Sequence, residues 1–167
     1  MPVLTPTPTA PRLAGVPRRQ CLSLVGASLL GLGLVGCASK PVTSTVGLTL
    51  AASADVNPDP RGRASPLTVR VYALKLSTGF DAADFFSLYD KDSATLGADM
   101  LQREEFLLRP GENKTLALTL PAEAGALAVF AAYRDLEHAR WRAVRQVEVG
   151  KAVQWRVKLG QRQVSFE

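Results

Sequence analysis

The sequence predicts a mainly β protein, a two-sheet β-sandwich with a short helical addition. Along residues 42–167, apolar and polar residues alternate over short segments that proline, glycine and other turn residues separate. This is the pattern of half-buried strands. One stretch, residues 81–89, departs from the alternation and predicts the helix. Residues 42–167 have the usual length of one domain, so we expect a single sandwich.

Residues 1–36 predict a lipoprotein signal peptide. An uncharged apolar run at residues 22–34 follows Arg18-Arg19, as in a signal peptide, and is too short to cross a bilayer comfortably. The arginine pair also gives a weak match to a twin-arginine signal, so the sequence leaves the export route open.

The end of this apolar run predicts a lipid anchor. Leu34-Val35-Gly36-Cys37 resembles the lipobox of bacterial lipoproteins, which implies that Cys37 becomes the acylated first residue of the mature chain. Residues 37–41 then form a lipidated tether ahead of the sandwich. Ala38, where retained lipoproteins carry Asp, implies export to the outer membrane.

Removing this leader changes the charge balance. The full sequence has 20 Lys and Arg against 15 Asp and Glu. Arg12, Arg18 and Arg19 precede Cys37 and no acidic residue does, so 17 basic and 15 acidic residues remain, a net charge of +2. Because phosphate binding needs a clustered basic face, we expect no nucleic-acid partner. With Cys21 removed and Cys37 acylated, we expect no disulfide.

The alternating segments predict the strands in order. The first, residues 42–50, alternates valine or leucine with threonine or glycine. Residues 126–133 are apolar on both faces, which predicts a central strand covered on each side. The last clear strand has Trp155 on its apolar face, so we expect Trp155 in the core. The expected strands are 42–50, 67–76, 100–108, 115–120, 126–133, 141–149 and 153–159, and 164–166 extends or adds to the last edge.

Residues 82–89 predict a short helix. The Asp81 side chain is suited to capping the free N–H groups at the helix start, and Asp84 adds an acid where the helix dipole favours one. Phe80 and Phe85 have the spacing of a hydrophobic staple. We expect the aromatic side chains to pack over one end of the sandwich.

The composition excludes most catalytic chemistries. The chain has one histidine, His138, and the mature chain keeps no free thiol, which excludes Cys-His catalysis and common His-based metal sites. Asp55-Val-Asn-Pro-Asp59 begins like a calcium loop, but Pro60 and Pro66 stand where such a loop has Gly and Glu. We therefore expect no enzyme, no metal, and no cofactor apart from covalent lipid on Cys37.

A distinctive motif joins the first two predicted strands. Asn57-Pro-Asp-Pro-Arg-Gly-Arg-Ala-Ser-Pro66 runs directly into Leu67-Thr-Val-Arg-Val-Tyr-Ala-Leu74. With the motifs that follow it in order, this segment resembles TssJ, the family of outer-membrane lipoproteins of bacterial type VI secretion systems. The resemblance covers residues 37–167, and the further motifs are Phe80, Ala83-Asp84, Leu96-Gly97-Ala98-Asp99, Arg109-Pro110-Gly111, 131–136 and Trp141-Arg142.

The resemblance implies a fold and a function. TssJ proteins have a transthyretin-like β-sandwich with a small helical addition, lie on the inner leaflet of the outer membrane, and bind the periplasmic C-terminal region of the inner-membrane protein TssM. With TssL they form an envelope-spanning complex. In that family the loop between the first two strands contributes to TssM binding. Here this implies a site within residues 53–66, with the contact residues Asn57, Asp59, Arg61, Arg63 and Ser65.

The loop has physical features that suit binding. Pro58, Pro60 and Pro66 limit its entropy, and its two arginines carry charge that orients a partner. An alternative is that residues 62–66 only set the geometry with which the second strand begins. Two other functions stay open. One is a pilot-type or other β-sandwich lipoprotein of a different envelope complex, and the other is a periplasmic small-molecule carrier, which needs an apolar pocket.

Overall fold

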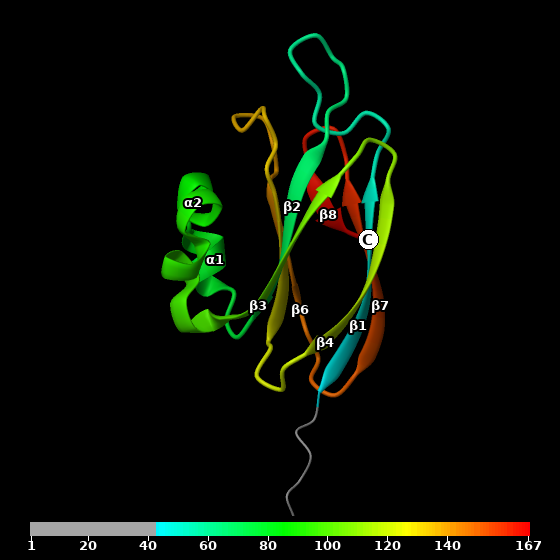
Figure 1. The fold of residues 1–167 in the computed structure, drawn as a ribbon. Helices are drawn as coiled ribbons and strands as arrows, with labels where there is room; N and C mark the ends of the chain where they lie inside the picture. Colours follow the sequence, from blue (N-terminus) through cyan, green and yellow to red (C-terminus); the bar gives the residue numbers. More distant parts are fainter. Residues whose placement is uncertain (1–42) are drawn as a thin grey trace, which may run out of the picture. The chain divides into compact units, whose positions relative to one another are not determined.

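A computed structural model describes residues 43–167, which form two four-stranded β-sheets with two short helices outside them (Figure 1). Sheet A has the strand order β4-β1-β7-β8 and sheet B the order β3-β2-β5-β6. Cys37 and the predicted leader and tether lie outside the described residues. The strands are β1 (Ser44–Ala52), β2 (Leu67–Leu74), β3 (Met100–Leu108), β4 (Asn113–Leu120), β5 (Ala126–Ala131), β6 (Arg142–Gln146), β7 (Ala152–Leu159) and β8 (Val164–Phe166).

The two sheets enclose one hydrophobic core. In β1 the alternation places Val46, Leu48 and Leu50 inward with no exposed surface, and β1 pairs with β4 antiparallel and with β7 parallel. Sheet B contributes the inward residues of β2 and β5. The two-sheet sandwich predicted from the alternation is confirmed. The side chains that the two sheets bury within residues 43–167 form one continuous core, as in a domain that folds independently.

A second apolar layer lies on the outer face of sheet B, where the helices pack (Figure 1), and not over one end of the sandwich as the sequence predicted. All six residues of β5 are buried because the sandwich covers one face and the helices cover the other. The helices are α1 (Thr78–Ala82) and α2 (Phe85–Leu96), and a short 3-10 turn, η1 (Gly97–Asp99), leads into β3. This layer consists of Tyr72, Leu74, Phe80, Leu88, Leu96, Ala126, Ala128 and Phe130.

The helical segment begins differently from the prediction. Asp81 lies inside α1 and Phe80 is buried within the same helix, so the expected cap at Asp81 and the staple with Phe85 are wrong. Extended backbone at Ala83 divides the segment into two helices. Asp84 caps α2 instead, since its carboxylate accepts the Ser87 N–H at 3.0 Å and the Ser87 hydroxyl at 2.5 Å. These bonds lower the pKa of Asp84.

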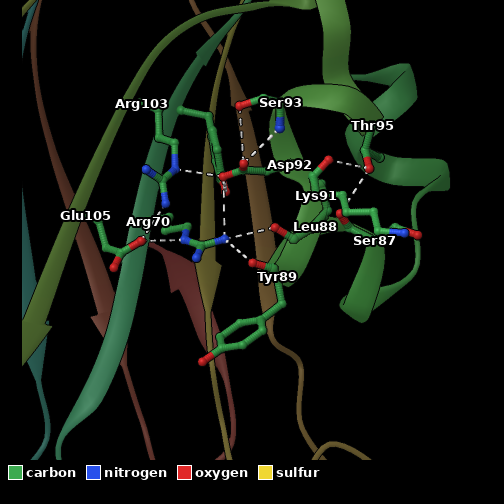
Figure 2. Close-up of polar contacts among 11 residues, drawn as sticks. Arg70, Ser87, Leu88, Tyr89, Lys91, Asp92, Ser93, Thr95, Arg103 and Glu105 are labelled. Atoms are coloured by element: carbon green, nitrogen blue, oxygen red, sulfur yellow. Dashed lines mark hydrogen bonds and ion pairs between the residues drawn. The ribbon is translucent and has the colours of Figure 1, made fainter.

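A buried arginine joins α2 to sheet B (Figure 2). Arg70 on β2 is 9% exposed, and its Nε donates to Glu105 Oε2 at 2.7 Å. Its Nη1 donates to the carbonyl oxygens of Leu88 and Tyr89, each at 2.9 Å. These carbonyls lie just before a kink at Lys91, where the helical dihedral angles are interrupted. Arg70 therefore satisfies backbone groups that the kink releases.

Asp92 completes this polar cluster from the helix side. It accepts the Tyr72 hydroxyl at 2.9 Å and pairs with Arg103 Nε at 2.7 Å (Figure 2). Burial disfavours its charge, but the hydrogen bond from Tyr72 and the charges of Arg103 and Arg70 outweigh burial and lower the pKa of Asp92. Burial, together with the hydrogen bond to Asp92, raises the pKa of Tyr72 to about 12.

Two sandwich positions differ from the prediction. The strand expected at 141–149 ends at Gln146, and Val149 lies in the following turn with 54% of its surface exposed. Trp155 is only partly buried. Because β8 pairs only with residues 157–159 of β7, Trp155 lies beyond its cover and contacts Phe166 edge to face, with ring centroids 5.9 Å apart.

Candidate partner-binding loop

The loop of residues 53–66 connects β1 to β2 and projects from one end of the sandwich (Figure 1). The chain enters β1 at the opposite end (Figure 1). The loop also crosses from sheet A to sheet B. Its base is fixed by Val56, which is fully buried in the core, and by the Ser53 N–H, which donates to the Leu159 carbonyl at 2.9 Å.

Asn57 ties the loop to two other segments at this end. Its Nδ2 donates to the Pro66 carbonyl at 2.8 Å, and its Oδ1 accepts the Arg134 N–H at 2.9 Å. Its own N–H donates to the Gln161 carbonyl at 3.1 Å. The backbone φ of +49° is in the left-handed region, which Asn tolerates better than most residues. Asn57 is therefore the point where three connections meet.

Asp59 shapes the tip of the loop. Its Oδ1 accepts the N–H groups of Arg61 and Arg63, each at 2.9 Å, and its Oδ2 pairs with Arg63 Nη2 at 2.7 Å. The Gly62 N–H donates to the Asp59 carbonyl at 2.8 Å, in a turn whose φ of +78° at Gly62 favours glycine. The Arg63 backbone and side chain lower the pKa of Asp59. The tip is thus ordered by one carboxylate rather than by burial.

The five predicted contact residues differ in exposure. Asn57 and Ser65 are buried, and the Ser65 hydroxyl contacts the Arg63 carbonyl at 3.5 Å. Their side chains hold the loop and do not face solvent. Arg61 and Arg63 are exposed. Arg63 forms an ion pair with Asp59, whereas Arg61 forms no ion pair within residues 43–167. The side chains exposed to solvent at the tip of this loop are therefore those of Pro60, Arg61 and Arg63.

Residues that sequence reasoning missed lie beside the loop. Asp135 accepts His138 Nδ1 and Arg162 Nε, each at 2.8 Å, and these bonds lower the pKa of Asp135. Arg134, Asp135 and Arg162 line a hollow of about 340 Å³ next to Pro58, Asp59 and Pro60. In the sequence, the only signal was the polar connection of residues 135–140 between two predicted strands. No local pattern could show that these residues lie beside the loop, because the fold brings them there.

A family model decides the identity of the chain. The T6SS-SciN family, described as type VI secretion lipoproteins that include VasD, EvfM and TssJ, matches residues 44–162. The chain belongs to the TssJ family. The predicted resemblance is thereby confirmed, and the matched residues include the whole 53–66 loop.

Solved structures of other proteins share this TssJ fold. The chain is 38% identical to the T6SS lipoprotein TssJ1 from Pseudomonas aeruginosa, with a TM-score of 0.71, covering 77% of this chain and 96% of that one. Serratia marcescens Lip, described as a membrane bound component of the type VI secretion system, is 24% identical with a TM-score of 0.69, covering 77% and 97%. A chain in a structure described as the TssM C-terminal domain from EAEC is 22% identical with a TM-score of 0.64, covering 74% and 97%. No curated protein sequence matched.

Two further observations concern the part of this TssJ chain that the structure describes. Between residues 43 and 167, no three His, Cys, Asp or Glu side chains gather as metal ligands do. Asp55, the first acid of the calcium-like segment, instead accepts Gln161 Nε2 at 2.7 Å. Neither helix of the same residues is long and apolar enough to cross a membrane.

Proposed function

We propose that this TssJ-family chain is an outer-membrane-anchored lipoprotein subunit of the type VI secretion membrane complex. A lipid on Cys37 holds it at the periplasmic face of the outer membrane, and the 53–66 loop binds the periplasmic C-terminal region of TssM. With TssL, this contact tethers the trans-envelope complex to the outer membrane. The chain acts by binding a protein partner. Its role involves no catalysis, no metal and no nucleic acid.

The observation that carries this proposal is the position of the ordered loop. β1 has nine residues and so is about 30 Å long, and it separates the loop from the end where the chain enters the sandwich (Figure 1). Residues 38–43 reach at most about 20 Å. A lipid on Cys37 therefore keeps the end of the sandwich where the chain enters β1 near the bilayer. The 53–66 loop, at the opposite end, is directed into the periplasm. The match to a chain solved in a structure described as TssM supports TssM as the partner.

The alternatives are less well supported. A small-molecule carrier needs an enclosing apolar pocket of about 300 Å³ or more. The hollow inside the sandwich, between Val71, Leu118 and Leu127, has a volume of about 10 Å³, and the hollows of about 340 and 570 Å³ lie open at the surface. A pilot-type lipoprotein of another channel shares the anchor and the fold, and the membership in the type VI family argues against it.

The anchor is tested by Cys37→Ser in the full chain. We expect the variant to leave the outer-membrane fraction, because the acylated side chain is removed, and secretion to be lost while the sandwich still melts as in the wild type. Continued fractionation with the outer membrane and normal secretion would disprove the lipid anchor.

The partner is tested by cross-linking the lipidated wild-type chain in intact membranes and identifying the linked peptides by mass spectrometry. We expect TssM peptides joined to residues within 53–66, and TssL recovered through TssM. Cross-links from this loop to a subunit of a different secretion channel would favour the pilot-type alternative, and cross-links to TssM from another surface would move the site.

A further inference from the structure

The two flanks of the sandwich differ in how they are closed. On one flank, the β3–β4 connection joins the sheets, and Gln102 Nε2 of β3 donates to the Thr119 carbonyl of β4 at 3.2 Å. On the other flank, the residues just before β6 and β8 form one parallel bridge, between Arg140 and Gln163, and beyond it the two strands lie near each other without backbone pairing. Beyond that bridge β6 follows sheet B and β8 follows sheet A, and an open groove of about 570 Å³ lies between them.

The outer edge of β6 presents unpaired backbone to this groove. β6 pairs only with β5, and the bonds from Ala131 N–H to the Trp141 carbonyl and from Val147 N–H to the Gly125 carbonyl show that odd-numbered residues face β5. In an antiparallel pair, the alternate residues direct both backbone groups away from the partner. Arg142, Val144 and Gln146 therefore point their N–H and C=O groups outward, and no backbone group of residues 43–167 pairs with them there.

The chain itself occupies the adjacent position on this edge. Arg140 has the same orientation, and its N–H donates to the Arg162 carbonyl at 2.8 Å while its carbonyl accepts the Val164 N–H at 2.9 Å. Residues 162–164 therefore pair with Arg140, and the chain then continues into β8 of sheet A. The next three outward positions stay open to a strand supplied from elsewhere.

The groove carries positive charge on an apolar floor. Among its lining residues, Arg140 and Arg142 are charged and none carries a carboxylate, whereas Ala143, Val164 and Phe166 are apolar. Arg142 Nη1 is held by the carbonyls of Phe80 and Ala83, on the helix side of sheet B. Ala143 packs into the sandwich core. The two faces of an added strand therefore meet different surroundings, one cationic and one apolar.

We propose that the β6 edge binds an extended segment of a partner protein by strand addition, and that this segment alternates acidic with small apolar side chains. The backbone of the segment pairs with Arg142, Val144 and Gln146, its acidic side chains face Arg140 and Arg142, and its apolar side chains cover the groove floor. Strand addition gains affinity from backbone bonds and specificity from alternate side chains.

The test uses the sandwich domain, residues 38–167, and two labelled probe peptides, one that alternates glutamate with valine and one that alternates lysine with valine. We expect saturable binding of the acidic probe only. Hydrogen exchange should slow at the amides of Arg142, Val144 and Gln146, while Ala143 and Arg145, already bonded to β5, stay unchanged. This alternating protection is specific to pairing at the outer edge.

Matched variants separate strand addition from simple charge attraction. Val144→Pro removes an outward N–H and should weaken the acidic probe about tenfold, whereas Val144→Ala keeps that N–H and should bind as the wild type does. Ala117→Pro removes a corresponding outward N–H on β4, an edge strand of sheet A, and should not affect binding. Arg140→Glu should weaken binding, and Arg109→Glu on the β3–β4 turn should not.

The proposal is overturned if the acidic probe does not bind, if both probes bind equally, or if bound probe leaves exchange at Val144 unchanged. It is also overturned if the free protein protects these amides in a concentration-dependent dimer, because a second copy then occupies the edge. Should Val144→Pro fail to fold, the exchange pattern of the wild type with its probe still decides the question.

Discussion

The helical layer and the 53–66 loop are both insertions between strands, but different interactions order them. The helices bury Phe80, Leu88 and Leu96 on sheet B, with Arg70 beneath them. The loop buries Val56 at its base and otherwise depends on hydrogen bonds made by Asn57 and Asp59. The first insertion is part of the folded core, whereas the second is ordered while it stays exposed. A surface that is ordered without burial is available to a partner at a low entropic cost.

The largest effect is expected from removing the buried charge under the helices. Arg70→Ala leaves Asp92 and two backbone carbonyls of α2 without their buried donor, so we expect a loss of about 3–5 kcal/mol in unfolding free energy. The matched control is Arg103→Ala, which removes a more exposed partner of Asp92 and should cost much less. Urea unfolding measures both, and equal small losses would show that Arg70 does not hold the layer.

We expect a smaller loss of stability when Asn57, the residue that fixes the loop, is replaced. Asn57→Ala removes hydrogen bonds to the Pro66 carbonyl and the Arg134 N–H and places alanine at a positive φ. We expect a loss of about 2 kcal/mol and faster hydrogen exchange confined to residues 53–66 and the Arg134 amide. Uniformly faster exchange over the whole sandwich would mean that the loop belongs to the core.

Acid should release the helical layer before the sandwich. The folded pKa of Asp92 is lowered, so its contribution to stability is fully present above the pKa of an unfolded aspartate, about 3.9, and is lost as pH falls through the lowered value. The rings of Tyr89, Phe130 and Trp141 pack around Phe85, and near-ultraviolet circular dichroism of this aromatic cluster follows the step. Asp92→Asn should remove that pH dependence, and an unchanged acid profile in this variant would assign the step to another group.

Alternation predicted the sandwich because most strands, unlike β2 and β5, have one face on the core and one on solvent. It placed Trp155 correctly on the core side, but it overestimated the burial of this residue, which the short β8 leaves partly exposed. The helix start was misplaced because Asp81 and Asp84 both suit a cap, and only packing selects between them. The burial of Arg70 was not predictable, because in sequence it occupies a polar position of an alternating strand and the helices that cover it come later in the chain.

The loop was predictable as a loop, but its division of roles was not. Prolines and arginines mark residues 53–66 as a stiff, charged connection. That Asn57 is buried follows from its bond to the backbone of Arg134, a residue distant in sequence. Arg134 and Arg162 reach the same surface for the same reason. Local pattern gives the place of the loop, and long-range contacts decide which of its side chains are exposed.

The role of the loop is tested most directly by changing its exposed charges while Asp59 keeps its bonds. Arg61→Glu combined with Arg63→Gln reverses one charge and neutralises the other without placing a carboxylate beside Asp59. We expect about tenfold weaker binding of residues 38–167 to the TssM periplasmic fragment, with a smaller or reversed dependence on ionic strength. Thermal stability should stay within about 0.5 kcal/mol of the wild type.

A control with Lys91→Glu and Arg109→Gln makes the same change of charge at exposed sites outside the loop, and we expect it to bind TssM nearly as the wild type does. Titration calorimetry at two ionic strengths, beside a melting curve, gives each quantity. Weaker binding confined to the loop variant, at unchanged stability, is the predicted result. Equal TssM affinity in the loop variant and the wild type would contradict a binding role for this loop.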